Sequence, residues 1–233
     1  MPIVRLGDRF VLGLDAEGVD ELLDLRRDES SRSLTLAEIV ERATTLLRAA
    51  LRYARQLPPE HHEHPTARAG GAEDAFQPIT LPDGSVVSWP DGRPYIPHPT
   101  AFDLFRHIVA HGGKLLYLAE DPDAELYPNL LVFALVGYPD EQAGVSEIGD
   151  QVDDILGRLH RWLEAGPDDV ERVVVAYDGR RQTRREALQA NAYSMAQHTR
   201  QLMSMVQDLG IEPQEPLQEA DYEGLGVPAA VWA

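Results

Sequence analysis

Two histidines and an aspartate share one face of a predicted helix. His107 and His111 are four residues apart in "AFDLFRHIVAHGGKLLYLAED", and Asp103 lies one turn earlier on the same face. On an α-helix, residues four apart lie about 6 Å from each other along the axis and point the same way. Imidazole nitrogens and carboxylate oxygens are ligands for divalent metals. The spacing therefore makes this face a candidate metal-binding surface.

A second polar face is predicted in "NAYSMAQHTRQLMSMV". Asn191, Ser194 and His198 recur there at spacings of three and four. If the two faces meet inside a helical bundle, His107 and His198 can bind one metal ion together. Bundle cores of other proteins hold metals between side chains of facing helices in this way. The alternative is that each histidine is hydrogen-bonded separately in the core, because spacing within a helix does not show which helices meet.

The remaining histidines are expected at the surface. "HHEH", residues 61–64, follows two prolines and lacks helical spacing, so we predict a solvated loop, with a surface metal site as the alternative. His160 lies beside Arg161 on a predicted amphipathic helix. The sequence contains no nucleophile elbow, phosphate loop, HExxH or EF-hand pattern.

Composition limits the classes of function. The chain has 233 residues, of which 43% are hydrophobic and 26% charged, which is enough apolar material for a core. It has no cysteine, which excludes disulfides, thiolate metal sites and a cysteine nucleophile. The net charge of −18 disfavours nucleic acid and anionic membranes as partners. We expect a cytoplasmic protein.

Four long amphipathic helices must position the polar faces. The apolar spacing and end signals predict them at residues 35–57, 100–121, 147–166 and 183–209. Thr35 with Glu38, and Thr183 with Glu186, have the spacing of capping boxes. The fold class predicted is mainly α, an up-down four-helix bundle with long connections.

Short β elements are predicted between and before the helices. "PIVRLGDRFVLGL" indicates a hairpin, followed by a short helix, within residues 1–26. Residues 58–99 form a long insertion in which "PITLPDGSVVSW" predicts a second hairpin. "RVVVAYDGRR" predicts a strand and turn, and "NLLVFALVGY", residues 129–138, is either a buried helix turn or a strand.

From residue 34 to residue 233 the sequence resembles the DinB/YfiT-like superfamily of four-helix bundles. The stretches that carry the resemblance are "LFRHIVAH", "VVAYDGRRQTRREALQANAYSMAQHTRQL" and "LGIEP…ADYEGLGVPAAVW". The resemblance implies a site of three histidines around a divalent metal, Zn, Ni or Fe. His107 matches the first ligand and His198 the last, whereas Ser194 stands at the middle position.

A hydroxyl is a poorer ligand than imidazole for these metals. The resemblance therefore implies a degenerate site of low occupancy, unless His111, Asp103 or a water held by Ser194 replaces the third ligand. It also implies a pocket lined by Asn191, Ser194 and Gln197.

Residues 1–25 resemble the last hairpin and helix of a glutaredoxin. Pro2 matches the family's cis-proline, but the redox cysteines and the first half of that fold are missing, so no thiol redox activity is implied. The domain organisation predicted is a glutaredoxin-like remnant at 1–26 and a DinB-like bundle at 34–233.

Three functions remain open at this point. The first is a metal-dependent transferase or isomerase that uses a small thiol cofactor. The second is a non-catalytic bundle that binds a small molecule, and the third is a dimeric interaction protein that has lost the metal. We expect a homodimer in each case.

Overall fold

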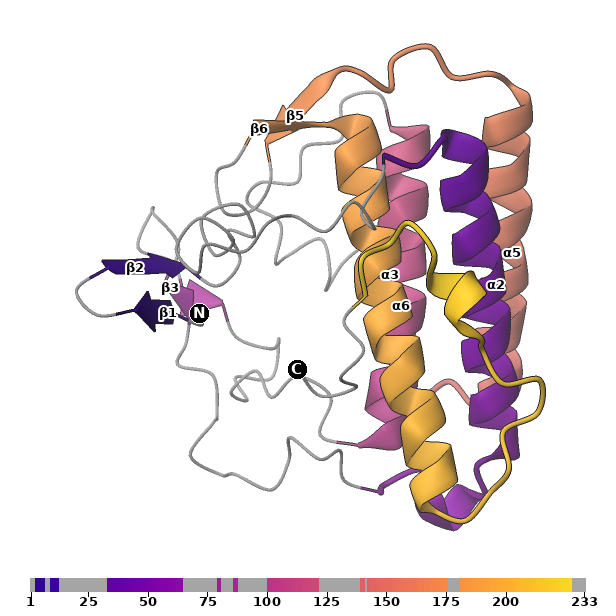
Figure 1. Cartoon of the computed structure of the whole chain (residues 1–233). Coiled ribbons are helices and arrows are strands. Elements are labelled where there is room, and N and C mark those ends of the chain that lie inside the picture. Colours follow the sequence, from indigo (N-terminus) through magenta and orange to yellow (C-terminus); the bar gives the residue numbers. More distant parts are fainter. Residues whose placement is uncertain are drawn as a thin grey trace.

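The computed structural model describes residues 3–6, 9–12, 33–64, 79–80, 86–87, 100–121, 139–140, 142–175 and 181–227. Most of these residues belong to four long helices that pack side by side (Figure 1). The helices are α2 (Leu36–Gln56), α3 (Ala101–Glu120), α5 (Val145–Glu164) and α6 (Arg184–Asp208). The prediction of a mainly α four-helix bundle is confirmed, and none of these helices is long and apolar enough to cross a bilayer.

Side chains at the helix starts fix where the helices begin. The Thr35 hydroxyl accepts from the backbone N–H of Glu38, and the Glu38 carboxylate accepts from the backbone N–H of Thr35. The same reciprocal pair joins Thr183 and Glu186. Both predicted capping boxes are therefore present, and each satisfies backbone donors that the helix itself leaves unpaired.

Pairs of contacts at the helix ends give the direction of each helix. The N–H of Ala101 donates to the carbonyl of His64, so α3 starts where α2 ends and runs back along it. Arg106 donates to the carbonyl of Ala143 near the start of α5, and Glu120 at the end of α3 pairs with Arg158. Therefore α3 and α5 are parallel, and the prediction of simple up-down alternation is wrong at this connection.

The length of the connecting segment explains the parallel pair. A tight turn would force α3 and α5 to be antiparallel, whereas a parallel pair needs a connection as long as the bundle. A helix of 20 residues is about 30 Å long, and residues 121–144, at about 3.3 Å per extended residue, are long enough to span it. The predicted helix turn or strand at 129–138 lies outside the described residues.

Within the described residues, three short antiparallel hairpins accompany the helices. The strands are β1 (Ile3–Leu6) with β2 (Arg9–Leu12), β3 (Ile79–Thr80) with β4 (Val86–Val87), and β5 (Val173–Val175) with β6 (Arg181–Thr183). The third hairpin lies between α5 and α6, where the sequence predicts a strand and turn. The short helix expected within residues 1–26 lies outside the described residues.

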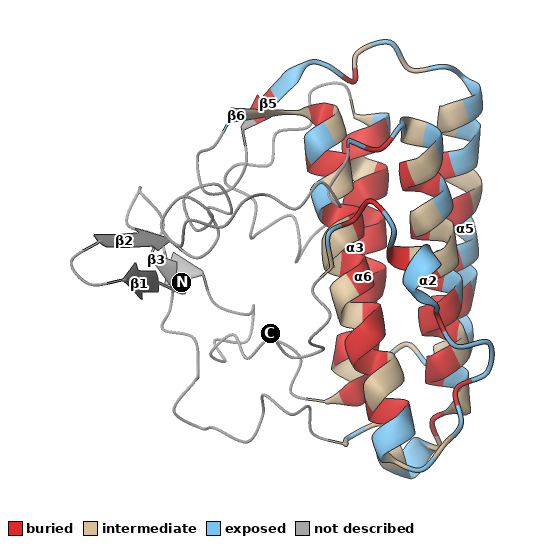
Figure 2. Cartoon of the chain, viewed as in Figure 1, coloured by how far each residue is buried: buried red, intermediate tan, exposed pale blue. Residues whose placement is uncertain are grey.

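The core fills the space between the four helices, and buried positions gather on their inward faces (Figure 2). Among them, Gly112 of α3 lies against Leu47 of α2: a Cβ at this glycine would be 2.9 Å from the Leu47 Cδ1 atom. The glycine therefore lets α2 and α3 approach closely beside His111.

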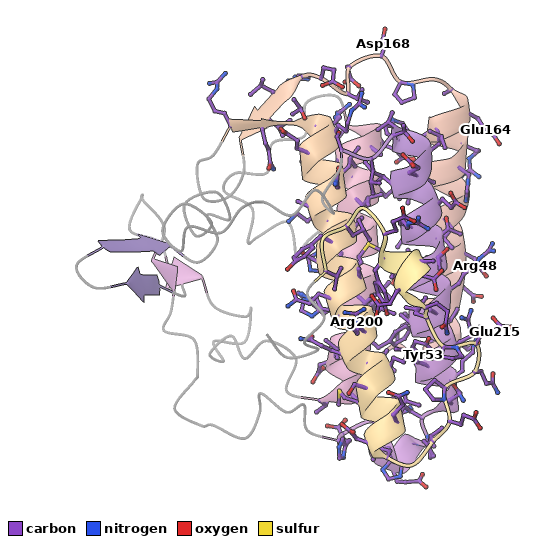
Figure 3. The ribbon with its side chains drawn as sticks, viewed as in Figure 1. Arg48, Tyr53, Glu164, Asp168, Arg200 and Glu215 are labelled. Atoms are coloured by element: carbon purple, nitrogen blue, oxygen red, sulfur yellow. The ribbon has the colours of Figure 1, made fainter. Side chains whose placement is uncertain are left out.

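The segment after α6 returns along the bundle and is tied to α2. The Tyr53 hydroxyl accepts from the N–H of Leu217 at 3.0 Å and donates to the carbonyl of Glu215 at 3.3 Å. Arg200 of α6, labelled in Figure 3, pairs with Glu219, one residue of the 3-10 helix η4 (Glu219–Tyr222). These contacts cover the C-terminal half of α2 and hold residues 215–219 against the bundle.

Candidate metal centre

Three histidines from two helices meet in the bundle. His107 and His111 come from α3 and His198 comes from α6, and one nitrogen of each lies within 4.8 Å of the others. The rings of His107 and His198 are 4.9 Å apart between centroids, and those of His111 and His198 are 5.8 Å apart. The two polar helix faces predicted from the sequence therefore do meet.

The helical spacing on α3 explains how two of the rings come together. His107 and His111 are separated by one turn, and their Nε2 atoms lie 3.0 Å apart. Each side chain is only 6% exposed. Two imidazole nitrogens that face each other at this distance, away from solvent, need either a shared proton or a cation between them.

Side-chain amides contact the Nδ1 atoms of two rings. The Nδ1 atom of His111 lies 3.4 Å from the Asn191 Oδ1 atom, and the Nδ1 atom of His198 lies 2.8 Å from the Gln201 Oε1 atom. In both rings Nδ1 is engaged by the protein. Histidines that bind metals are oriented by such partners.

The donor set fits a divalent transition metal. Two nitrogens that each lie about 2.1 Å from one ion are separated by about 3.0–3.4 Å at ligand angles of about 90–110°. The pair on α3 is already at 3.0 Å. The largest separation, at most 4.8 Å, exceeds this range by about 1.4 Å, so the three nitrogens would have to move closer together around an ion. Imidazole ligands suit Zn, Ni, Fe and Cu.

Two residues considered for the third position do not join the cluster. The Ser194 hydroxyl donates to the carbonyl of Ala190 on its own helix at 3.2 Å. The Asp103 carboxylate accepts from the Thr100 hydroxyl at 2.8 Å at the start of α3. The third imidazole is His111, which the spacing placed beside His107. His111 was one of the two substitutes considered for the third position.

The predicted pocket residues have different surroundings. Asn191 is 5% exposed and contacts His111, whereas Ser194 and Gln197 are partly buried on α6. The pocket predicted from the resemblance stays a prediction.

The "HHEH" cluster has a structural role at the end of α2. The His62 ring stacks on Phe102 at 4.8 Å between centroids, and its Nε2 atom donates to the carbonyl of Leu57 at 3.2 Å. Within the described residues, the histidines of 61–64 form no group that could hold a metal. His160 is exposed, as predicted, and contacts the Thr44 hydroxyl.

Sequence reasoning missed Lys114, the one lysine of the chain. It lies three residues after His111 and seven after His107, so it shares their stripe of α3. It is 7% exposed, and burial lowers the pKa of its ammonium group to about 8. The spacing of seven from His107 was the signal that could have identified it.

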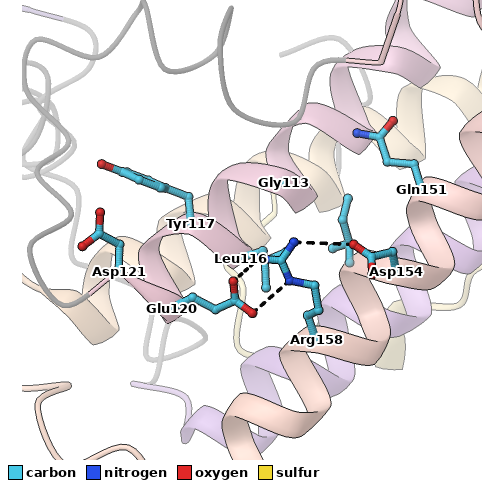
Figure 4. Close-up of a pocket in the computed structure, with 9 residues that line it drawn as sticks. Gly113, Leu116, Tyr117, Glu120, Asp121, Gln151, Asp154 and Arg158 are labelled. Atoms are coloured by element: carbon cyan, nitrogen blue, oxygen red, sulfur yellow. Dashed lines mark hydrogen bonds and ion pairs between the residues drawn. The ribbon is translucent and has the colours of Figure 1, made fainter.

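A cavity of about 340 Å³ lies between α3 and α5 (Figure 4). Tyr117 and Glu120 of α3 and Gln151, Asp154 and Arg158 of α5 contribute to its lining. Arg158 pairs with both Glu120 and Asp154, and the hydrogen bond that it donates to Glu120 raises the pKa of the guanidinium. The cavity and the histidine cluster are lined by different residues.

Fold and site together define a four-helix bundle with a buried cluster of three histidines that could hold a metal ion. No protein-family model matches the sequence, and neither a curated protein nor a solved structure is significantly similar to it. The resemblances to the DinB/YfiT-like superfamily and to glutaredoxin therefore stay predictions.

Proposed function

We propose that the protein is a metal-dependent enzyme whose ion is bound by His107, His111 and His198. The observation that carries the proposal is the convergence of three imidazole nitrogens within 4.8 Å. A set of three histidines leaves a coordination position for water or substrate, which distinguishes catalytic from structural sites.

The three histidines differ in burial and therefore in their proposed roles as ligands. His107 and His111 are buried and give the ion two fixed ligands from one helix, while the partly buried His198 completes the set from the more accessible side. When bound, a divalent ion with an open position supplies Lewis acidity that lowers the pKa of a water or thiol there. Following the resemblance of the sequence, we propose transfer or isomerisation with a small thiol.

Metal content tests the first part of the proposal. Protein purified without a histidine tag is incubated with Zn²⁺, Ni²⁺ or Fe²⁺, dialysed and analysed by mass spectrometry for metal. We expect one ion per chain, and an affinity loss of more than about 100-fold in His111→Ala and His198→Ala, since losing an outer-shell partner alone weakens binding about 10–100-fold. The matched control His160→Ala replaces an exposed histidine and should bind like the wild type.

Two further variants decide between the ligand sets considered for the sequence. Ser194→Ala and Asp103→Asn should leave affinity unchanged, because both side chains are engaged on their own helices. Co²⁺-loaded protein titrated with 2-mercaptoethanol should then develop a thiolate-to-cobalt absorption band. A protein that binds no metal, or that loses as much affinity in the control as in the histidine variants, would contradict the proposal.

A second candidate function is small-molecule binding without catalysis, and the cavity between α3 and α5 favours it. Its volume of about 340 Å³ lies in the range of ligand sites, and the acidic side chains of its lining outnumber the basic ones. We expect a small amine to raise the melting temperature of the wild type more than that of Asp154→Asn. An equal rise in both proteins would argue against this function.

A further inference from the structure

Two carboxamide side chains lie beside the histidine cluster, and each contacts the Nδ1 atom of one ring. Asn191 contacts Nδ1 of His111, and Gln201 contacts Nδ1 of His198. A neutral imidazole carries its proton on one nitrogen only. The partner at Nδ1 therefore decides which nitrogen keeps a free lone pair.

The orientation of Asn191 is fixed by its own helix. Its Nδ2 atom donates to the carbonyl of Ala187 at 2.8 Å, so its Oδ1 atom is the one turned toward His111. A carbonyl oxygen only accepts hydrogen bonds, so Nδ1 of His111 must be the donor. The side chain is 5% exposed, which removes water as a competing partner.

Gln201 presents its amide oxygen to the ring on α6. It lies three residues after His198, one helical turn away, and its Oε1 atom is 2.8 Å from Nδ1. Gln201 is 6% exposed. In both rings the proton is thus held at Nδ1, which leaves the lone pair on Nε2.

We propose that Asn191 and Gln201 are positioning residues that fix the Nδ1–H tautomer of His111 and His198. This inference rests on the proposed function for its effect on metal binding. The tautomer itself is a property of the metal-free protein. Two of the three ligands then need no change of protonation site when an ion binds.

The experiment compares variants that keep or remove the acceptor. Gln201→Met has similar length and no acceptor, Gln201→Glu keeps an acceptor, and Gln207→Met makes the same change at an exposed position of α6. Long-range ¹H–¹⁵N spectra of the imidazole rings are recorded in the chelated protein at a pH where the rings are neutral. Zn²⁺ affinity is measured by competition with a chromogenic chelator.

We expect Nδ1–H for His198 in the wild type, Gln201→Glu and Gln207→Met, and a population with the proton on Nε2 in Gln201→Met. Zinc affinity should fall about 10-fold in Gln201→Met and stay within twofold in the other two. The same comparison with Asn191→Leu and Asn191→Asp tests His111. If one acceptor-free variant does not fold, the other ring still gives a result.

Unchanged tautomers in the acceptor-free variants would overturn the inference, and so would an affinity loss in Gln207→Met as large as in Gln201→Met. A wild-type protein that binds none of Zn²⁺, Ni²⁺ and Fe²⁺ overturns the proposed function instead. The spectra of the metal-free rings still decide the tautomer in that case, so the two failures can be told apart.

Discussion

Replacing Lys114 by methionine should stabilise the protein at neutral pH. Burial lowers the pKa of this lysine from 10.5 to about 8, while the unfolded chain keeps a value of about 10.4. A difference of about 2.5 pKa units corresponds to about 3 kcal/mol that the folded state loses by holding the charged form. Methionine has a similar length and no charge, so this loss disappears.

The pKa difference also sets the direction in which the free energy of unfolding changes with pH. Below pH 8 the lysine is protonated in both states, and the full penalty applies. Between pH 8 and about 10.4 the unfolded chain binds more protons than the folded one, so stability rises with pH. Above that range both states are neutral at this residue and the penalty is gone. The wild type should therefore gain stability across this range, and Lys114→Met should lack that gain.

Urea unfolding followed by circular dichroism measures the difference, in chelator, at pH values from 6.5 to 10.5. We expect Lys114→Met to raise the free energy of unfolding by about 3 kcal/mol at pH 7 and by much less at pH 10.5. Leu116→Met is the control, since it places methionine at another buried position of α3 and should keep the wild-type slope. Because the chain has one lysine, ¹³C-lysine labelling gives one side-chain signal, which should titrate near pH 8.

A destabilised Lys114→Met, or a lysine signal that titrates above pH 10, would refute the reasoning. The first result would mean that the ammonium group is held by interactions worth more than its desolvation. The second would mean that the charge is solvated in the folded protein.

Three further predictions concern the fold, and each is measured by urea unfolding. Gly224→Ala should lower the free energy of unfolding by about 2–4 kcal/mol, since its φ of +81° is strained for alanine and its Cβ would overlap buried Leu34. The control Gly166→Ala, at φ +68° with open space around it, should lower it by only about 1–2 kcal/mol. If both variants lose the same stability, the overlap with Leu34 makes no contribution. Tyr53→Phe should lose about 1–3 kcal/mol because the buried N–H of Leu217 loses its acceptor, and a loss below about 0.5 kcal/mol would mean that water replaces it. Arg158→Ala should lower the free energy of unfolding by no more than about 1 kcal/mol, and by less at high salt, because the arginine is 41% exposed and solvent screens its ion pairs. A larger loss that does not depend on salt would contradict this prediction.

Helix positions could be read from the sequence because their signals are local. The capping boxes at Thr35 and Thr183 lie within four residues, and the apolar stripes repeat within one helix. The direction of α5 relative to α3 could not be read, because an apolar stripe shows which face is buried and not which helix covers it. Only the length of residues 121–144 bears on that question, and length permits a parallel pair without requiring one.

The candidate site, too, could be predicted from the sequence only in part. Spacing placed His107 and His111 on one face, and the structure adds that His198 meets both. The resemblance favoured a ligand position at Ser194, on α6, whereas the third ring comes from α3. The rotation of α6 about its own axis decides between these arrangements, and it depends on packing along the whole helix. Gln201 was missed because a glutamine three residues from a histidine is common on helix surfaces.

The contacts between α2 and residues 211–225 have a consequence for folding during synthesis. Tyr53 meets Leu217 across 164 positions of sequence. At about 5–20 residues per second, a ribosome needs about 10–30 s to make that stretch. During that interval the surface of α2 that residues 211–225 later cover stays exposed, so a chaperone can bind the nascent protein there.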